Sequence, residues 1–365
     1  EGKIFNTAVV IHNGKILGIV PKTYIPGYKE FYEERWFSPA RDLLKKEIKL
    51  LGQTVPIGSD LLFQIGVDSD IILGIEICED LWAPLPPSSF QVLRGANIIA
   101  NLSASNELIG KADYRRLLVS QQSARGVSGY IYSSSGVHES TTDVVFSGHA
   151  LIAENGSILA ESDRFKREGE MIVSEIDLER LVIDRERMTS FGESIHESPK
   201  KDFRFVSIPF RSAPLRALNR KMDPNPFVPQ NSAERDKRAK EIFSIQIAAL
   251  AKRLEYSKID KMVLGLSGGL DSTLAFHVEV KTADELNIPR KNILTFSLPG
   301  FGTSKRTRNN AKLLAESLGA SMEEIDIKNG VSQLFKDIKH DSKIQNPVYE
   351  NAQARFRTLE LMSKA

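Results

Sequence analysis

The sequence has a single cysteine, no long apolar run and almost no excess of either charge. One cysteine cannot close a disulfide within the chain, and such scarcity is typical of proteins that fold in a reducing compartment. No stretch approaches the roughly 18 consecutive apolar residues that a membrane-spanning helix needs. The 49 Lys and Arg side chains against 47 Asp and Glu side chains leave a net charge of +2. This balance is too even for binding nucleic acid or an anionic membrane through bulk charge. We therefore expect a cytoplasmic protein whose partners are small molecules, with no nucleic acid and no membrane.

The composition is otherwise that of an ordinary globular protein. Hydrophobic residues make up 41% and charged residues 26% of the 365 residues, which excludes a disordered or low-complexity chain. At about 150 residues per domain, this length predicts two domains. The first residue is Glu1 rather than Met, with no charged-then-apolar leader after it. We expect the sequence to begin partway through a larger protein, and to end at Ala365 within a helix of an incomplete second domain.

The first part of the chain, residues 1–210, is expected to be a layered α/β domain. Two apolar runs, 8–20 and 150–160, are each interrupted by Asn-Gly, at Asn13 and at Asn155. Both residue types tolerate the positive φ of a type I′ turn, so each run predicts a β-hairpin. Further strands are expected at 61–67, 71–77, 96–102 and 130–133, and helices at 88–94 and 111–125. The hairpins among these alternating elements predict a mixed sheet or a sandwich rather than a purely parallel sheet.

A proline-rich connection, residues 211–232, precedes the expected second domain, residues 233–365. A long helix is expected at 233–254, followed by strands at 262–266, 293–298 and 322–327 and by helices at 270–286 and 307–318. This βαβαβ pattern predicts a doubly wound parallel sheet, whose ligands bind at the carboxyl ends of the strands.

A glycine- and serine-rich string directly follows the first of these strands. It reads Gly265-Leu266-Ser267-Gly268-Gly269-Leu270-Asp271-Ser272. Backbone N–H groups and hydroxyls at a strand-to-helix junction can surround an anion, and the following helix N-terminus favours negative charge. Without Gly-Lys-Ser/Thr it is not a Walker A loop; the plain alternative is a glycine-rich turn with a helix cap. The string resembles the pyrophosphate loop of N-type ATP pyrophosphatases. The resemblance implies ATP bound at residues 265–272, Mg²⁺ held with the help of Asp271, and no redox cofactor.

Two more strings extend this resemblance. Pro299-Gly300-Phe301-Gly302-Thr303-Ser304 follows the next strand, and Glu350-Asn351-Ala352-Gln353-Ala354-Arg355-Phe356-Arg357-Thr358 lies near the end. Alone, the first could be any loop and the second an exposed helix face. With the pyrophosphate loop they resemble the NAD⁺ synthetases. The resemblance implies that Asn351 and Arg355 bind deamido-NAD and that Ser297 contacts the adenylate. The family residues that close the ATP site further downstream have no counterpart before residue 365.

The single cysteine, Cys78, follows the expected buried strand 71–77. A cysteine in that position is more often a small core residue than a nucleophile. However, it lies where the chain turns, and Cys78-Glu79-Asp80-Leu81-Trp82, preceded by Pro21-Lys22-Thr23-Tyr24, resembles the nitrilase-type glutamine amidases. The resemblance implies that Cys78 is the nucleophile and that Lys22 stabilises the oxyanion. A surface lysine is the alternative for Lys22.

The resemblance also implies a base glutamate upstream of Lys22. Glu1 is the only carboxylate there, and its setting does not match, so we expect the base on sequence outside this chain. Glu33 fits the position of a second, supporting glutamate. The resemblance also implies four residues that contact glutamine: Tyr28, Glu79, Ser105 and Lys111. At the position of Lys111, an arginine is common in relatives. Each of these could instead be an ordinary surface or loop residue.

Together the two resemblances cover almost the whole chain, in the order found in glutamine-dependent NAD⁺ synthetases. They imply a nitrilase-like α-β-β-α sandwich followed by an ATP pyrophosphatase domain, and a homo-oligomer. The expected reaction is ATP-dependent amidation of deamido-NAD, with ammonia released from glutamine and carried along an enclosed route. Two alternatives remain: an adenylating ligase that acts on another carboxylate, and a scaffold without glutaminase activity.

Overall fold

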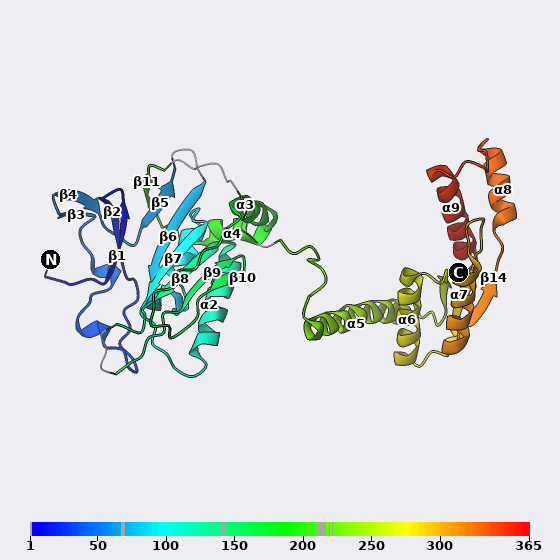
Figure 1. Ribbon diagram of the computed structural model, residues 1–365, viewed down its shortest axis with the longest axis horizontal. Coiled ribbons are helices and arrows are strands. Elements are labelled where there is room, and N and C mark those ends of the chain that lie inside the picture. Colours follow the sequence, from blue (N-terminus) through cyan, green and yellow to red (C-terminus); the bar gives the residue numbers. More distant parts are fainter. Residues whose placement is uncertain are drawn as a thin grey trace. The chain divides into compact units, whose positions relative to one another are not determined.

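The computed structural model describes residues 2–66, 70–139, 143–199, 201–210, 217–218, 220 and 222–365. The chain forms two units, Glu1–Met222 and Asp223–Ala365, each described by itself below (Figure 1). Residues 211–216, 219 and 221 of the expected linker, and Val67 of an expected strand, lie outside the described residues. No helix in the described ranges has both the length and the apolar character that crossing a membrane requires.

The first unit combines strands with short helices. Its strands are β1 (Thr7–His12), β2 (Lys15–Pro21), β3 (Glu47–Leu50), β4 (Gln53–Pro56), β5 (Leu61–Ile65), β6 (Ile71–Ile77), β7 (Ile98–Ser103), β8 (Gly129–Ser134), β9 (Ala150–Glu154), β10 (Ser157–Glu161) and β11 (Arg204–Ile208). Its helices are η1 (Glu33–Arg35), η2 (Ala40–Asp42), η3 (Cys78–Leu81), α1 (Pro87–Val92), α2 (Lys111–Gly126), α3 (Leu178–Arg187) and α4 (Thr189–Glu197).

Seven of these strands form one mixed sheet, in the order β10-β9-β8-β7-β6-β5-β11. The central strands β6, β7 and β8 are parallel, with α1 and α2 in the two crossovers, whereas β9 and β10 continue the sheet antiparallel. The prediction of a mixed sheet is therefore confirmed. Because β6 and β7 are parallel, their carboxyl ends meet at one edge of the sheet, and Cys78 follows β6 at that edge.

The two faces of this sheet pack against different layers. Leu62 and Ile99 face the helices, where they pack in one cluster with Val119 of α2. Phe63, one residue after Leu62, points to the opposite face because successive strand side chains alternate. There it packs with Val20 of the β1–β2 hairpin, in a cluster that also includes Cys78. The cysteine thus lies between the sheet and the hairpin.

Both expected hairpins are confirmed. β1 and β2 are joined at Asn13 and Gly14, with φ of 48° and 74°, and β9 and β10 at Asn155 and Gly156, with φ of 43° and 86°. Positive φ at both central residues is the type I′ geometry that the Asn-Gly pairs predict.

The second unit contains a three-stranded parallel sheet, β12 (Met262–Gly265), β13 (Ile293–Ser297) and β14 (Ser321–Glu324), in that order. Its helices are α5 (Ser232–Ser257), α6 (Leu270–Glu285), η4 (Arg290–Asn292), α7 (Lys305–Leu318), α8 (Lys328–Asp337) and α9 (Pro347–Lys364). The predicted βαβαβ run is confirmed. One core cluster joins the sheet to α5, α6 and α7, and another joins it to α8 and α9, so helices cover both faces.

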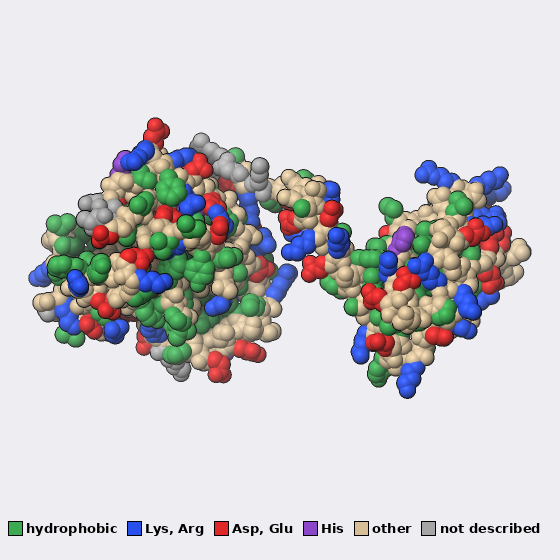
Figure 2. Space-filling view, turned by 90° about the horizontal axis from the view of Figure 1, so that it is seen from below, with side chains coloured by type: hydrophobic (Ala, Val, Ile, Leu, Met, Phe, Trp, Pro, Cys, Tyr) green, Lys and Arg blue, Asp and Glu red, His purple; other side chains and the backbone are tan. Residues whose placement is uncertain are grey.

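Charged side chains of both signs are interspersed on the surface of each unit (Figure 2). Hydrophobic side chains gather more visibly on the first unit in this view. The mixture fits a chain of net charge +2, in which neither sign dominates.

Helix α6 carries a carboxyl group, that of Glu279, whose charged form is destabilised by burial. Glu279 lies between the buried Val278 and Val280, its Oε2 has no hydrogen-bond partner, and burial raises its pKa to about 7. Between pH 4.5 and 7 the folded state therefore binds more protons at Glu279 than the unfolded state does. The free energy of unfolding consequently falls as pH rises through this range.

Replacing this group should remove the pH-dependent loss of stability. We expect Glu279→Gln to be more stable than the parent at pH 8 by about 1–3 kcal/mol, with a smaller gain at pH 5. Calorimetric unfolding of the second unit at both pH values measures the difference. Asp337→Asn, on the same unit, is the exposed control. An equal difference between Glu279→Gln and the parent at both pH values would contradict the prediction.

Candidate functional site

The backbone at Cys78 is held in a left-handed conformation. Its φ is 48°, which costs a non-glycine residue on the order of 1–3 kcal/mol and persists only where surrounding contacts enforce it. The Cys78 N–H donates to Asn101 Oδ1 at 3.1 Å, and the preceding Ile77 N–H donates to Asp80 Oδ2 at 2.9 Å. The chain thus leaves β6, turns sharply and starts η3, with Cys78 at the turn and on the wall of a cavity.

The structure joins two other predicted catalytic residues directly. Lys22 follows the end of β2, and Glu33 begins η1. The buried Lys22 ammonium lies 2.8 Å from both carboxylate oxygens of Glu33. Lys22 also acts electrostatically on Glu79 and Asp80, the two residues that follow Cys78. The lysine, the glutamate and the cysteine turn are therefore neighbours.

The cavity beside Cys78 has a volume of about 290 Å³. It is lined by Tyr28, Lys29, Glu30, Phe31, Cys78, Glu79, Trp82, Ser105, Leu108, Lys111 and Tyr114. All four residues predicted to bind glutamine are among them. The Tyr28 hydroxyl donates to Glu79 Oε1 at 2.9 Å, and burial together with this carboxylate raises the pKa of Tyr28 to about 12. Burial likewise raises the pKa of Glu79.

A lysine and two aromatic rings form another part of the wall. The Lys111 ammonium lies 5.4 Å from the ring centroids of Phe31 and Trp82 and donates to Asn106. Burial lowers the pKa of Lys111, and cation–π contacts favour its charged form. Glu30 accepts a hydrogen bond from Asn106 at 2.8 Å. The cavity therefore presents a cation, Lys111, and carboxylates, Glu30 and Glu79.

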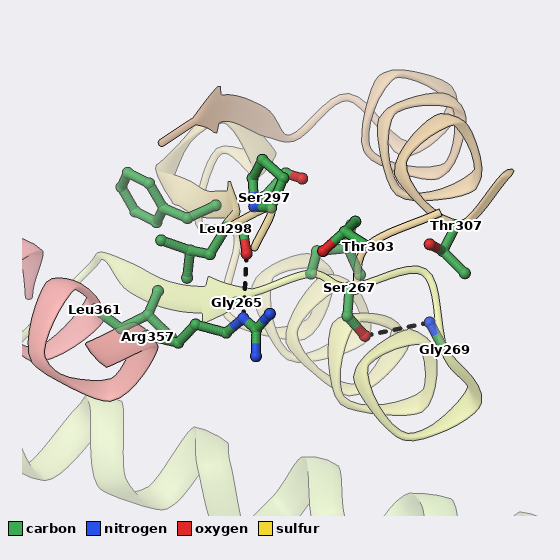
Figure 3. A pocket seen from close by; sticks show the side chains of 12 residues that line it. Gly265, Ser267, Gly269, Ser297, Leu298, Thr303, Thr307, Arg357 and Leu361 are labelled. Atoms are coloured by element: carbon green, nitrogen blue, oxygen red, sulfur yellow. Dashed lines mark hydrogen bonds between the residues drawn. The ribbon is translucent and has the colours of Figure 1, made fainter. Parts of the chain in front are cut away.

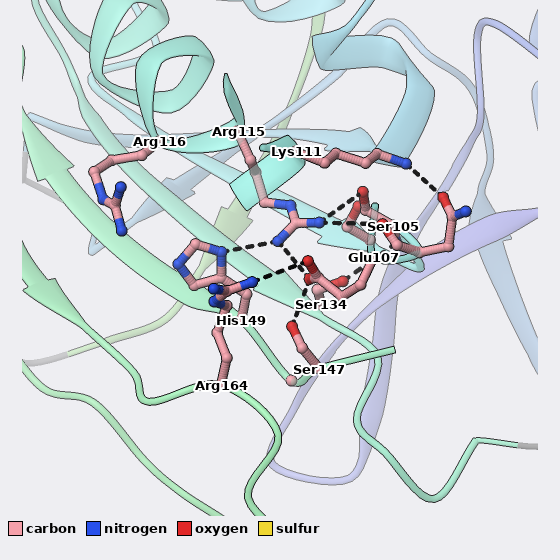
Figure 4. A network of polar contacts seen from close by, with 12 residues as sticks. Ser105, Glu107, Lys111, Arg115, Arg116, Ser134, Ser147, His149 and Arg164 are labelled. Atoms are coloured by element: carbon pink, nitrogen blue, oxygen red, sulfur yellow. Dashed lines mark hydrogen bonds and ion pairs between the residues drawn. The ribbon is translucent and has the colours of Figure 1, made fainter. Parts of the chain in front are cut away.

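Ser105 is positioned by a buried network of polar groups (Figure 4). Its Oγ accepts a hydrogen bond from Arg115 Nη2 at 3.1 Å, and its N–H donates to Ser134. Arg115 is itself fully buried, paired with Glu107 at 2.9 Å and bonded to His149 Nδ1 at 2.8 Å. Arg115 is not among the site residues predicted from the sequence, because nothing in the local pattern of α2 distinguishes a buried arginine from an exposed one.

The second unit has a cavity of about 370 Å³ at the carboxyl ends of β12 and β13 (Figure 3). It is lined by Gly265, Leu266, Ser267, Gly269, Phe296, Ser297, Leu298, Pro299, Thr303, Thr307, Arg357 and Leu361. Five of the residues predicted to bind ATP are in this list: Gly265, Leu266, Ser267, Gly269 and Ser297. The position agrees with the general rule that ligands of parallel α/β sheets bind beyond the strand ends.

The remaining predicted loop residues lie around this cavity. Gly268 has φ 79°, and a Cβ there would lie 2.2 Å from the Thr307 carbonyl oxygen, so only glycine fits. The Ser272 hydroxyl lies 3.0 Å from the Ser267 hydroxyl and donates to the Gly269 carbonyl. Leu270 and Asp271 are exposed in the first turn of α6. The serine hydroxyls thus shape the loop, while Asp271 faces solvent beside it.

Helix α9 contributes a different arginine to the cavity than the one predicted to bind substrate. Asn351 and Arg355 lie exposed on α9 and do not line this cavity. Arg357 does line it, and its Nε donates to the Leu298 carbonyl at 3.1 Å (Figure 3). Burial lowers the pKa of Arg357. Residues 350–358 contain both arginines, and only the fold distinguishes the exposed Arg355 from Arg357 at the cavity.

Comparisons with known proteins match the two units to two families. Residues 1–185 match the family model described as carbon-nitrogen hydrolase, and residues 242–365 match the one described as NAD synthase. The chain is 41% identical over 363 residues to proteins named glutamine-dependent NAD(+) synthetase from Mycobacterium bovis and Mycobacterium tuberculosis (strain H37Rv). These alignments cover 98% of this chain and 53% of each relative.

Among solved structures, a glutamine-dependent NAD(+) synthetase from Cytophaga hutchinsonii matches 97% of this chain and 56% of its own chain, with 20% identity and a TM-score of 0.41. The chain spans about half the length of the curated relatives it matches. The hydrolase model alone covers 185 of the 365 residues. The chain therefore belongs to the carbon-nitrogen hydrolase family, with a region matching NAD synthase on the C-terminal side.

Proposed function

We propose that the protein is a glutamine-dependent NAD(+) synthetase, which amidates deamido-NAD with ATP and with ammonia taken from glutamine. The observation that supports this best is the cavity beside Cys78 in the first unit. Cys78 lines this cavity together with Tyr28, Glu79, Ser105 and Lys111, and the buried Lys22 is paired with the half-buried Glu33. The 41% identity to proteins of that name over nearly the whole chain supports the same function.

In the first site, Cys78 is proposed to attack the glutamine side-chain amide. A lysine ammonium can stabilise the tetrahedral oxyanion, a role that fits Lys22. Both carboxylate oxygens of Glu33 lie 2.8 Å from Lys22 Nζ, so Glu33 is proposed to orient the lysine. Proton transfer from the thiol and to the leaving ammonia then falls to another carboxylate, the base glutamate predicted upstream of Lys22.

The charges around the cavity fit the amino-acid end of glutamine. Free glutamine carries an α-carboxylate and an α-ammonium group. Lys111 can pair with the carboxylate, while Glu30 or Glu79 can pair with the ammonium; all three line the cavity. A cavity that presents both charges and a nucleophile could bind the amino-acid group of the substrate while its amide reaches Cys78.

In the second site, the loop 265–272 is proposed to bind ATP and to support adenylation of the deamido-NAD carboxylate. Backbone N–H groups and the α6 N-terminus favour the phosphates. Among the described residues no cluster of three or more His, Cys, Asp or Glu could hold a metal ion by itself. This fits Mg²⁺ that arrives on the nucleotide, because Mg²⁺ is usually held by phosphates, waters and one or two carboxylates. Asp271 is the loop carboxylate available for it.

The assignment of Asn351 and Arg355 to deamido-NAD stays a prediction.

The organisation around these sites is also proposed. Residues 1–210 would form the glutaminase domain, 211–232 the linker and 233–365 the synthetase domain. A cytoplasmic location and a homo-oligomeric state stay predictions.

One assay separates this function from its alternatives. ATP turnover and ammonia release by the full-length protein are measured with glutamine, with and without deamido-NAD. We expect turnover of ATP to AMP to require deamido-NAD. ATP turnover that needs a different carboxylate would favour another adenylating ligase, and absence of ammonia release would favour the scaffold.

The glycine loop offers a test of the ATP site. We expect Gly268→Ala to weaken ATP binding by at least about tenfold, since its Cβ would collide with the Thr307 backbone at a left-handed φ. Gly302→Ala is the matched control, because nothing lies within 4 Å of a Cβ there. Isothermal titration with ATP measures both. Equal affinity in the two variants would show that the loop does not hold the nucleotide.

A further inference from the structure

The carboxylate of Asp80 connects two separate segments of the first unit. Asp80 is 1% exposed and lies in η3, two residues after Cys78. Its Oδ1 accepts hydrogen bonds from the N–H groups of Thr23 and Tyr24, at 3.1 and 2.8 Å. Its Oδ2 accepts one from the N–H of Ile77, at 2.9 Å, and a longer one from Thr23, at 3.4 Å. One buried side chain therefore binds the backbone of residues 23–24 and that of residue 77.

Both segments carry a group of the proposed glutaminase site. Thr23 and Tyr24 directly follow Lys22, and Ile77 directly precedes Cys78. The two segments belong to different layers, because β2 lies in the hairpin and β6 in the main sheet. Fixing both backbones to one carboxylate fixes the lysine relative to the cysteine. It also supplies one of the contacts that enforce the left-handed turn at Cys78.

A neutral side chain of the same size could not make all these bonds. Three N–H donors bind the carboxylate: those of Thr23 and Tyr24 lie closest to Oδ1 and that of Ile77 closest to Oδ2, with Thr23 also within 3.4 Å of Oδ2. An asparagine has a single acceptor oxygen, and its NH₂ group would face N–H donors on the other side. A buried N–H left without an acceptor costs on the order of 1–3 kcal/mol.

We propose that Asp80 is a positioning residue that fastens the Lys22 segment to the Cys78 turn, so that the ammonium and the thiol keep the separation that catalysis needs. This rests on the proposed function, in which Lys22 and Cys78 act together. Asp80 does not line the cavity and is assigned no contact with substrate. Burial raises its pKa to about 7, opposed by its backbone hydrogen bonds and by Lys22.

The test compares Asp80→Asn with Glu154→Gln in the full-length protein. Glu154 is the control because it is also a buried carboxylate that accepts a backbone N–H, from Asp177; it pairs in addition with Arg220, and it lies at the end of β9, outside the cavity. Alkylation of Cys78 by iodoacetamide is followed across pH by peptide mass spectrometry. Glutaminase kinetics and ammonia-supported NAD⁺ formation are measured in parallel.

We expect Asp80→Asn to lower glutaminase kcat by about 10²-fold, the scale of a misplacement of about 1 Å. KM for glutamine should change less than threefold, because Asp80 bonds to none of the residues predicted to bind glutamine. The alkylation profile of Cys78 should move to higher pH, since the lysine would stabilise the thiolate less well. Ammonia-supported activity should be unchanged. Glu154→Gln should leave kcat and the alkylation profile at parental values.

Parental kcat and a parental alkylation profile in Asp80→Asn would overturn the proposal, as would equal effects in Glu154→Gln. If Asp80→Asn does not fold, Asp80→Glu carries the test, because it keeps the charge but moves it by one methylene. A smaller shift in the same direction is expected, and no shift would overturn the proposal. Failure of the proposed function is distinguishable, since the parent protein would then lack glutaminase activity while the alkylation profile still reports the position of Lys22.

Discussion

Cys78→Ala is expected to abolish glutamine-supported NAD⁺ formation and to leave ammonia-supported formation intact. The single cysteine lies in the first unit, on the wall of its cavity, whereas the proposed ATP site lies in the second. Loss of a catalytic nucleophile reduces turnover by about 10⁴-fold or more. Free ammonia bypasses that step, so the second site should work at its usual rate.

The measurement is NAD⁺ formation by the full-length variant with either glutamine or saturating ammonium as nitrogen source. Cys78→Ser is the conservative companion: it retains the polar side chain but not the thiol, and should be equally inactive with glutamine. Loss of activity with ammonium in a variant that remains folded would show that the two sites do not divide the reaction in this way.

Asp271→Ala is expected to stop NAD⁺ formation with both nitrogen sources. Asp271 is the carboxylate in the first turn of α6, beside the loop that lines the second cavity. The proposed adenylation needs charge compensation at the pyrophosphate, and removing one preorganised electrostatic contact typically costs at least about 10²-fold in rate. The loss should precede any use of ammonia, so the nitrogen source should not matter.

Exchange of pyrophosphate into ATP, in the presence of deamido-NAD, isolates this step. Asp337→Ala, an exposed acidic position of the same unit on α8, serves as the control and should keep the parental exchange rate. Unchanged exchange in Asp271→Ala would remove Asp271 from the ATP site.

The sequence predicted those elements that depend on short stretches of the chain, such as tight turns and periodic apolar segments. The Asn-Gly pairs at residues 13 and 155 fix two hairpins because few other residues tolerate both positive φ values. The βαβαβ run follows from apolar strands separated by helical segments of sufficient length. In contrast, β3 and β4 are four-residue strands with mostly exposed or half-buried residues, and their short pattern gives too little periodicity to identify a strand.

Long-range pairing escaped prediction for a different reason. β11 lies parallel to β5, far earlier in the chain, and the Arg204 guanidinium pairs with Asp60 at 2.7 Å. The residues near 204 do not indicate which strand of the sheet has a free edge for β11. The pairing depends on the arrangement of all the strands of the sheet.

Some residues of the candidate site could likewise be predicted from local sequence, whereas others depend on long-range contacts. The cysteine, the lysine and the glycine loop stand in strings that a resemblance can identify. The supporting groups do not: Asn101 and Arg115 gain their importance from burial and from partners on other elements. Arg357 and Arg355 are two residues apart in one string, and only the orientation of α9 on the sheet places the former at the cavity.

The hydrogen bonds around Arg115 determine the tautomer of His149. A guanidinium can only donate, so His149 Nδ1 must accept from Arg115 at 2.8 Å. The ring proton is therefore on Nε2, which donates to Glu161 Oε1 at 2.9 Å. Burial lowers the pKa of this imidazole, so the ring stays neutral in the fold to a lower pH than a free histidine would. Placing a second proton on Nδ1 would set it against Arg115 and break that bond. The hydroxyl of Ser105, held by the same guanidinium, thus depends on an uncharged imidazole that lies outside the cavity.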